Sequence, residues 1–129
     1  MSVPITFVNN TTDVVTIGPS HTLREASSVM SDRSIGSVVV HDPEASGPGI
    51  LTERDIVRAV ASGVDLDAAT AGDHLTTDSA YGSPVWSLDE ATEAMKRGGF
   101  RHLVVVEGSS VVGIISMRDV VRAFGNIRT

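Results

Sequence analysis

The chain has 129 residues with a formal net charge of −6, and 41% of its residues are hydrophobic although only 4% are aromatic. That length suits one ordinary domain or two half-size units that share a core, and the acidic balance argues against general attraction to nucleic acid or to an anionic membrane. Because the chain lacks cysteine, disulfides and thiolate metal sites are excluded. No apolar run approaches the roughly 20 residues that cross a bilayer, and the chain does not begin with a signal-peptide pattern, so we expect a cytoplasmic protein without a membrane partner.

The first half of the chain predicts an extended segment, a helix, two strands and a second helix. The extended segment is "DVVTI" at 13–17, and the helix begins after Thr22 because Thr22 and Glu25 have the spacing of a capping box. The apolar positions of this helix recur at helical spacing and are Leu23, Ala26 and Met30. The elements that follow are a strand at 35–40, a Pro- and Gly-rich turn, a strand at 49–51 and a helix at 52–60.

The second half of the chain repeats the first. A shift of 65 residues places a second capping box at Ser87 and Glu90, followed by an apolar series of the same spacing: Leu88, Ala91 and Met95. After a shorter turn the shift is 64, and "GILTERDIVRAV" at 49–60 matches "GIISMRDVVRAF" at 113–124 at seven of twelve positions. Each half thus has the order β-α-β-β-α, in which the strand–helix–strand step predicts a parallel pair and the hairpin an antiparallel one.

The repeat sets the expected fold and its boundaries. We expect an α/β (α+β) fold made of two β-α-β-β-α units related by a pseudo-twofold axis, with mixed sheets packed against helices. The first unit is expected at 10–62, a linker and helix entry at 63–75, and the second unit at 76–125. Two copies are too few for a solenoid, which needs at least about three repeats, so the units should form one compact module.

A repeated motif at the last strand–helix junction of each unit points to a family. The pattern G-h-h-[ST]-x-x-D, with h apolar, stands at 49–55 and again at 113–119, and "RHLVVV" stands at 101–106. The tandem unit and this motif resemble a pair of CBS domains, the Bateman module, of the stand-alone kind found in bacteria and archaea. The resemblance covers roughly residues 10–125 and implies a flat homodimer with helices at its interface.

The duplicated motif has a structural and a chemical interpretation. Thr52 and Ser116 stand at N-cap positions and Asp55 and Asp119 at the third helical position, so each pair is a helix cap worth about 1 kcal/mol. A helix N-terminus also favours phosphate, and a carboxylate beside it can accept hydrogen bonds from both hydroxyls of a ribose. The resemblance implies the second role, with Asp on the ribose and Thr or Ser toward the phosphate of an adenosine nucleotide.

Basic residues near the motif are candidates for phosphate contacts. Arg54 and Arg118 lie inside the motif, and arginine recurs four residues later in both copies, at Arg58 and Arg122. A pair of like charges at this spacing is mildly unfavourable, so its repetition suggests contact with an anion or an acidic partner. The alternative is a solvated basic face.

Arg101 and His102 have no basic counterpart in the first unit, where the matching residues are Gly36 and Ser37. The resemblance implies that this strand lines a cleft between the units, so that Arg101 reaches phosphate and His102 makes the affinity depend on pH. The alternative is that Arg101 ends a strand at the surface.

The remaining candidate residues come from the resemblance alone. It implies that the Asp119 site also contains Asn10, Asp13, Val15 and Gly36. The Asp55 site would contain Asp78, Ala80 and Tyr81, the last as a possible stacking partner for a base. Ile50, Ile114, Ser37 and His102 complete the set from the neighbouring strands. Because the two sets differ, we expect unequal affinities.

The expected function is a regulatory one. We expect an energy-sensing module that binds AMP, ADP or ATP in the cleft between the units, with NAD or S-adenosylmethionine as lesser alternatives. No catalytic residue, required cofactor or metal is expected, since His21, His41, His74 and His102 share no ligand spacing and no nucleophile motif occurs. The rival functions are a ligand-free dimerisation module that acts on an unidentified regulated protein, and an enzyme acting on nucleotides.

Overall fold

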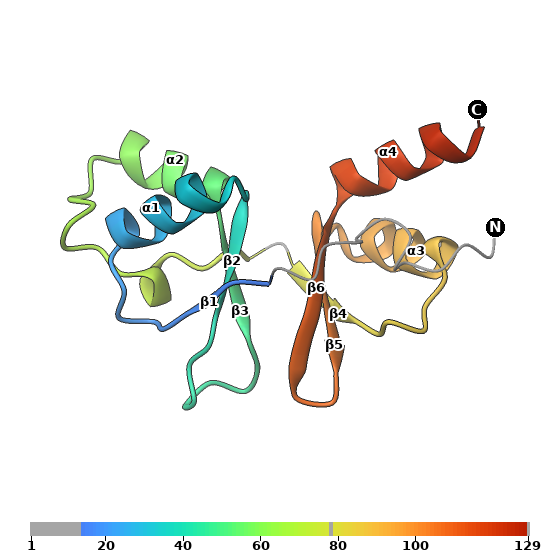
Figure 1. Cartoon of the computed structure of the whole chain (residues 1–129), viewed down its shortest axis with the longest axis horizontal. Coiled ribbons are helices and arrows are strands. Elements are labelled where there is room, and N and C mark those ends of the chain that lie inside the picture. The colour runs from blue at the N-terminus through green and yellow to red at the C-terminus, as the bar shows by residue number, and fades with distance from the viewer. Residues whose placement is uncertain (1–13, 78, 129) are drawn as a thin grey trace. The chain divides into compact units, whose positions relative to one another are not determined.

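A computed structural model describes residues 14–77 and 79–128 of the chain, with residues 123, 124 and 126–128 described by their backbone alone. The chain divides into two compact units (Figure 1). The N-terminal unit is Val15–Thr77, and the C-terminal unit includes the described residues 79–128. No helix in these described ranges is long and apolar enough to cross a membrane.

The N-terminal unit has the predicted order of strands and helices. Its elements are β1 (Thr16–Ile17), α1 (Leu23–Arg33), β2 (Ser37–Val40), β3 (Gly49–Thr52), α2 (Glu53–Ala61) and the 3-10 turn η2 (Ala71–Asp73). The sheet has the order β1-β2-β3, with β1 parallel to β2 and β2 antiparallel to β3. The mixed sheet expected from the strand–helix–strand–strand pattern is therefore confirmed.

The C-terminal unit repeats this arrangement. Its elements are β4 (Ser79–Gly82), α3 (Leu88–Gly98), β5 (His102–Glu107), β6 (Ser110–Ser116) and α4 (Met117–Arg128). β4 runs parallel to β5, and β5 pairs antiparallel with β6 across an irregularity between Val105 and Val106. The sequence repeat is thus a repeat of structure, element by element.

Local capping explains why the first helix of each unit begins where the sequence predicts. The side chains of Thr22 and Ser87 each accept a hydrogen bond from the backbone N–H three residues later, and Glu25 and Glu90 accept from the cap residues in return. The hydrogen bond that Glu25 accepts from the backbone N–H of Thr22 is the main reason why the pKa of the Glu25 carboxyl lies below its ordinary value of 4.5. Both predicted capping boxes are therefore confirmed.

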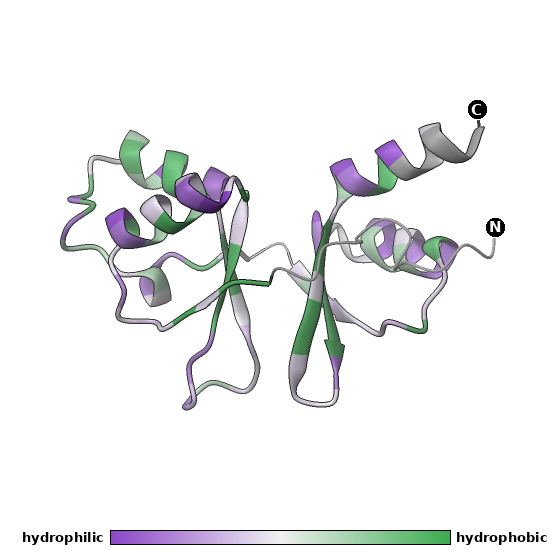
Figure 2. Ribbon diagram, viewed as in Figure 1, coloured by the Kyte–Doolittle hydropathy of each residue, from purple (hydrophilic) through white to green (hydrophobic). Residues whose placement is uncertain are grey.

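Each unit has its own cluster of buried apolar side chains. In the N-terminal unit the cluster joins one face of α1 to the strands and to α2, and contains Ile17, Leu23, Ala26, Met30, Val38, Val40, Leu51, Ala59 and Ala71. The C-terminal cluster contains Leu88, Ala91, Met95, Leu103, Val105, Ile115 and Val120. Figure 2 shows hydrophobic residues concentrated along the strands and on parts of the helices. The strand–helix junction of each unit therefore lies on a packed apolar core.

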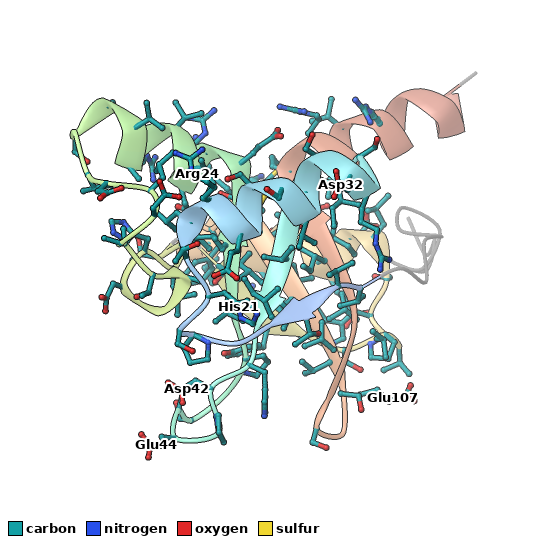
Figure 3. The ribbon with its side chains drawn as sticks, turned by 60° about the vertical axis from the view of Figure 1, so that its left-hand side comes forward. His21, Arg24, Asp32, Asp42, Glu44 and Glu107 are labelled. Atoms are coloured by element: carbon teal, nitrogen blue, oxygen red, sulfur yellow. The ribbon has the colours of Figure 1, made fainter. Side chains whose placement is uncertain are left out.

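The segment after α2 packs on the N-terminal unit. Its carbonyls at Leu66 and Ala69 accept hydrogen bonds from the first backbone N–H groups of α1, at Arg24 and Leu23, over 3.0 and 2.9 Å. The Arg24 side chain, labelled in Figure 3, pairs with Asp67 in the same segment. Residues 63–75, expected as a linker and helix entry, thus supply acceptors for the N–H groups of Leu23 and Arg24, which have no partner within the helix.

Candidate ligand-binding corners

Two strand-to-helix junctions carry the duplicated motif. The N-terminal corner consists of Gly36 and residues 52–55, and the C-terminal corner consists of Arg101 and residues 116–119. The antiparallel registers place Ser37 beside Thr52 and His102 beside Ser116. In both corners the first helical residue donates its backbone N–H, at 2.9 Å, to the carbonyl just before the central strand, from Glu53 to Gly36 and from Met117 to Arg101.

The N-terminal corner is closed by its own hydrogen bonds. Asp55 Oδ2 accepts from the backbone N–H of Thr52 at 2.8 Å and from the Thr52 hydroxyl at 2.9 Å. The N–H of Asp55 donates back to Thr52 Oγ1 at 3.3 Å. Thr52 and Asp55 are only 4% and 7% exposed. The single hydroxyl proton of Thr52 is thus used in the hydrogen bond to Asp55.

The C-terminal corner is more open. Asp119 Oδ2 accepts from the backbone N–H of Ser116 at 2.9 Å, and the N–H of Asp119 donates to Ser116 Oγ at 3.1 Å. Both residues are half-buried. Within the described ranges, the Ser116 hydroxyl donates to no acceptor and Asp119 Oδ1 accepts from no donor. This corner therefore has one hydroxyl donor and one carboxylate oxygen that no described residue uses.

The corners also differ in the side chains next to the cap. A Cβ atom placed on Gly36 would lie 3.5 Å from the Glu53 carboxyl carbon, so the Glu53 carboxylate lies over the N-terminal corner. The corresponding residues of the C-terminal corner are Arg101 and Met117. Sequence reasoning noted Arg101 but missed Glu53, although the contrast between "TERD" and "SMRD" inside the motif is visible in the sequence.

The predicted arginines on the second helices are accessible. Arg54 and Arg58 on α2, and Arg118 and Arg122 on α4, are all exposed. Among the described residues none of the four forms an ion pair or a side-chain hydrogen bond. Because the arrangement is the same in both units, it does not distinguish the two corners.

The other candidates of the N-terminal unit occupy its sheet. Val15 lies next to β1, where its carbonyl accepts from the N–H of Val39 at 2.8 Å, and its side chain packs against the N-terminal core. Ile50 is fully buried in β3, and Ser37 is half-buried beside Thr52. The structure therefore brings Gly36 and Ser37 to the Thr52–Asp55 pair.

The candidates of the C-terminal unit are distributed over all three strands. Ala80 is opposite Leu103 and packs against the core, whereas the next residue of β4, Tyr81, is 52% exposed. His102 and Ile114 are half-buried, and His102 lies beside Ser116. Three further candidates, Asn10, Asp13 and Asp78, lie outside the described residues.

Across residues 14–77 and 79–128, no three His, Asp or Glu side chains come together in a way that could hold a metal ion. The polar groups at the corners are hydroxyls, carboxylates and backbone N–H groups, which suit a sugar and a phosphate.

Comparison with known proteins places the chain in a family. Residues 8–62 and 71–126 each match the CBS domain. A CBS domain-containing protein of Bacillus subtilis is 33% identical over 110 residues, which cover 84% of this chain and 77% of the relative. The crystal structure of a CBS-domain containing protein of Agrobacterium tumefaciens, 35% identical, superposes with a TM-score of 0.76 over 96% of this chain and 95% of its own.

A further solved structure contains a nucleotide. It is a CBS domain protein of Pyrobaculum aerophilum complexed with AMP, 28% identical to this chain, with a TM-score of 0.74 over 91% of this chain and 89% of its own. The two family matches coincide with the two structural repeats, and the duplicated corner lies in both. The chain therefore belongs to the CBS domain family and contains a tandem pair of these domains.

Proposed function

We propose that this chain is a regulatory module that binds an adenosine nucleotide (AMP, ADP or ATP) at its strand-to-helix corners. CBS pairs are in general regulatory rather than catalytic, and the relative from P. aerophilum is complexed with AMP. The observation that carries the proposal is the half-buried Ser116–Asp119 pair, which leaves a hydroxyl donor and a carboxylate oxygen unused by the described residues.

The chemistry of this corner fits a sugar phosphate. Asp119 Oδ1 is an acceptor for the two hydroxyls of a ribose. The N–H of Arg118 donates to no partner among the described residues and, with the Ser116 hydroxyl, can donate to a phosphate at the start of α4. NAD and S-adenosylmethionine contain the same adenosine ribose and are the lesser alternatives.

Thermal unfolding tests the proposal. We expect 1 mM AMP, ADP or ATP to raise the melting temperature, because a ligand at 100 times its Kd stabilises the folded state by about 2.7 kcal/mol. Inorganic phosphate at the same concentration is the control for a general ionic effect and should cause a much smaller shift. The absence of a shift with AMP, ADP, ATP, NAD and S-adenosylmethionine would remove nucleotide binding from the account.

Three expectations from the sequence stay predictions: a regulated partner protein, an energy-sensing role and a cytoplasmic location.

The second candidate is a dimerisation module, and exposed apolar side chains favour it. Val57 and Val60 on α2 and Val121 on α4 are 64%, 56% and 64% exposed. Apolar side chains at matching places on both second helices fit a protein contact, and we propose a homodimer formed through them.

Sedimentation measures this association. We expect a mass of twice the 13.5 kDa of one chain, and a shift toward the single-chain mass for Val57→Asp. The control Val85→Asp changes a residue that is 87% exposed outside the helices and should leave the mass unchanged. A 13.5 kDa species at every concentration tested would rule out the dimer.

A further inference from the structure

We propose that the two corners divide adenosine ligands by charge, with Glu53 as the residue that makes the N-terminal corner reject a phosphate. The C-terminal corner then takes the phosphorylated ligand, and the N-terminal corner takes at most the uncharged nucleoside. This inference rests on the proposed function and assigns a separate specificity to each of its two sites.

The first argument is the position of Glu53. It is the first residue of α2, where its N–H donates to Gly36, and its carboxyl carbon lies 3.5 Å from the position of a Cβ on that glycine. Within the described ranges no cation pairs with this carboxylate and no donor hydrogen-bonds to it. A phosphate at the start of α2 would therefore meet an uncompensated negative charge in addition to that of Asp55.

The second argument is the difference in charge between the two corners. In the C-terminal corner Met117 replaces Glu53 and Arg101 replaces Gly36, while Arg118 corresponds to Arg54. The C-terminal corner thus has one negative charge fewer and one positive charge more. An AMP phosphate carries about −1.5 to −2 charges near neutral pH. The difference in charge between the corners therefore favours binding of this phosphate at the C-terminal corner. Each unit charge about 6 Å away in water changes an affinity by roughly threefold or more.

The third argument is the hydroxyl proton. Thr52 donates its proton to Asp55 at 2.9 Å, so an anion at that corner would have to break this bond to gain a donor. Ser116 donates to no residue in the described ranges and can donate to phosphate without breaking a hydrogen bond. Charge and hydrogen bonding therefore act in the same direction.

Titration calorimetry of single-corner variants tests the division. Asp119→Ala retains only the N-terminal corner, and Asp55→Asn, which keeps the shape of the side chain, weakens that corner and retains the other. We expect the ratio of AMP affinity to adenosine affinity to be at least about tenfold higher for Asp55→Asn than for Asp119→Ala, since the two corners differ by two charges and each contributes roughly threefold. We expect Asp119→Ala to bind AMP no more tightly than adenosine.

A reciprocal exchange tests the residue itself. In the Asp119→Ala protein, Glu53→Gln should raise AMP affinity roughly three- to tenfold and leave adenosine affinity unchanged, since it removes one charge. In the Asp55→Asn protein, Met117→Glu should lower AMP affinity by a similar factor. Because Met117 packs against the C-terminal core, Met117→Gln is the matched control for polarity. Thermal unfolding identifies any variant that is not folded. Because Glu53 is exposed, Glu53→Gln tests the inference even if substitution of Met117 unfolds the protein.

Two outcomes would overturn the inference while the proposed function stands. One is an Asp119→Ala protein that binds AMP at least tenfold more tightly than adenosine. The other is a Glu53→Gln exchange that changes AMP and adenosine affinity equally or not at all. If the unsubstituted chain binds neither AMP nor adenosine, the proposed function fails, and the inference fails with it.

Discussion

Replacing Asp119 by alanine should weaken AMP binding about 10- to 100-fold while reducing the stability of the fold by only about 1 kcal/mol. Hydrogen bonds to a charged group contribute about 1.5–3 kcal/mol, and each 1.4 kcal/mol is a factor of ten in affinity. The carboxylate also caps α4 through the N–H of Ser116, which accounts for the small loss of stability. Titration calorimetry measures the first effect and urea denaturation the second.

The control for Asp119→Ala is Asp32→Ala, which removes the same charge from an exposed position on α1 (Figure 3). Its AMP affinity should stay within about twofold of that of the unsubstituted protein, since the interaction of exposed charges is screened by salt. Equal losses in both variants would show that Asp119 acts only through net charge, and the ribose contact would have to be abandoned.

Replacing Asp55 by alanine should destabilise the protein more strongly, by about 2–3 kcal/mol. This carboxylate accepts hydrogen bonds from both the N–H and the hydroxyl of Thr52, and both residues are buried. Its removal leaves a buried donor without a partner, which costs about 1–3 kcal/mol, in addition to the lost helix cap. Asp119→Ala, in a half-buried corner, is the matched comparison.

Urea denaturation measured by two probes checks the expected difference. Far-UV circular dichroism follows the helices of both units, whereas fluorescence of the single tryptophan, Trp86, reports on the C-terminal core against which it packs. We expect the circular dichroism transition to shift further toward low urea for Asp55→Ala than for Asp119→Ala. Equal destabilisation by Asp55→Ala and Asp119→Ala would contradict the structural difference between the corners.

The elements that sequence reasoning predicted well are those fixed by local interactions. The capping boxes at Thr22 and Ser87 determine where α1 and α3 begin, because the hydrogen bonds involved span only three residues. The buried positions Leu23 and Leu88 follow from helical spacing alone. The repeat then assigns the same fold to both halves, since a pattern that forms a unit once forms it again.

Features that depend on distant residues could not be predicted in the same way. Residues 63–75 have the composition of a linker, but their carbonyls cap α1, a contact that requires the folded unit. The position of the Glu53 carboxylate over Gly36 depends on the β2–β3 register. The different exposure of Asp55 and Asp119, in nearly identical motifs, depends on packing that the motif does not encode.

The contacts of the segment after α2 determine where the two repeats can be separated. A fragment that stops at Ser62 lacks the carbonyls of Leu66 and Ala69, and it also lacks Ala71, which fills part of the core. Expression of the first repeat by itself, or insertion of a fluorescent tag between the repeats, therefore requires a junction after Thr77, where the first unit ends.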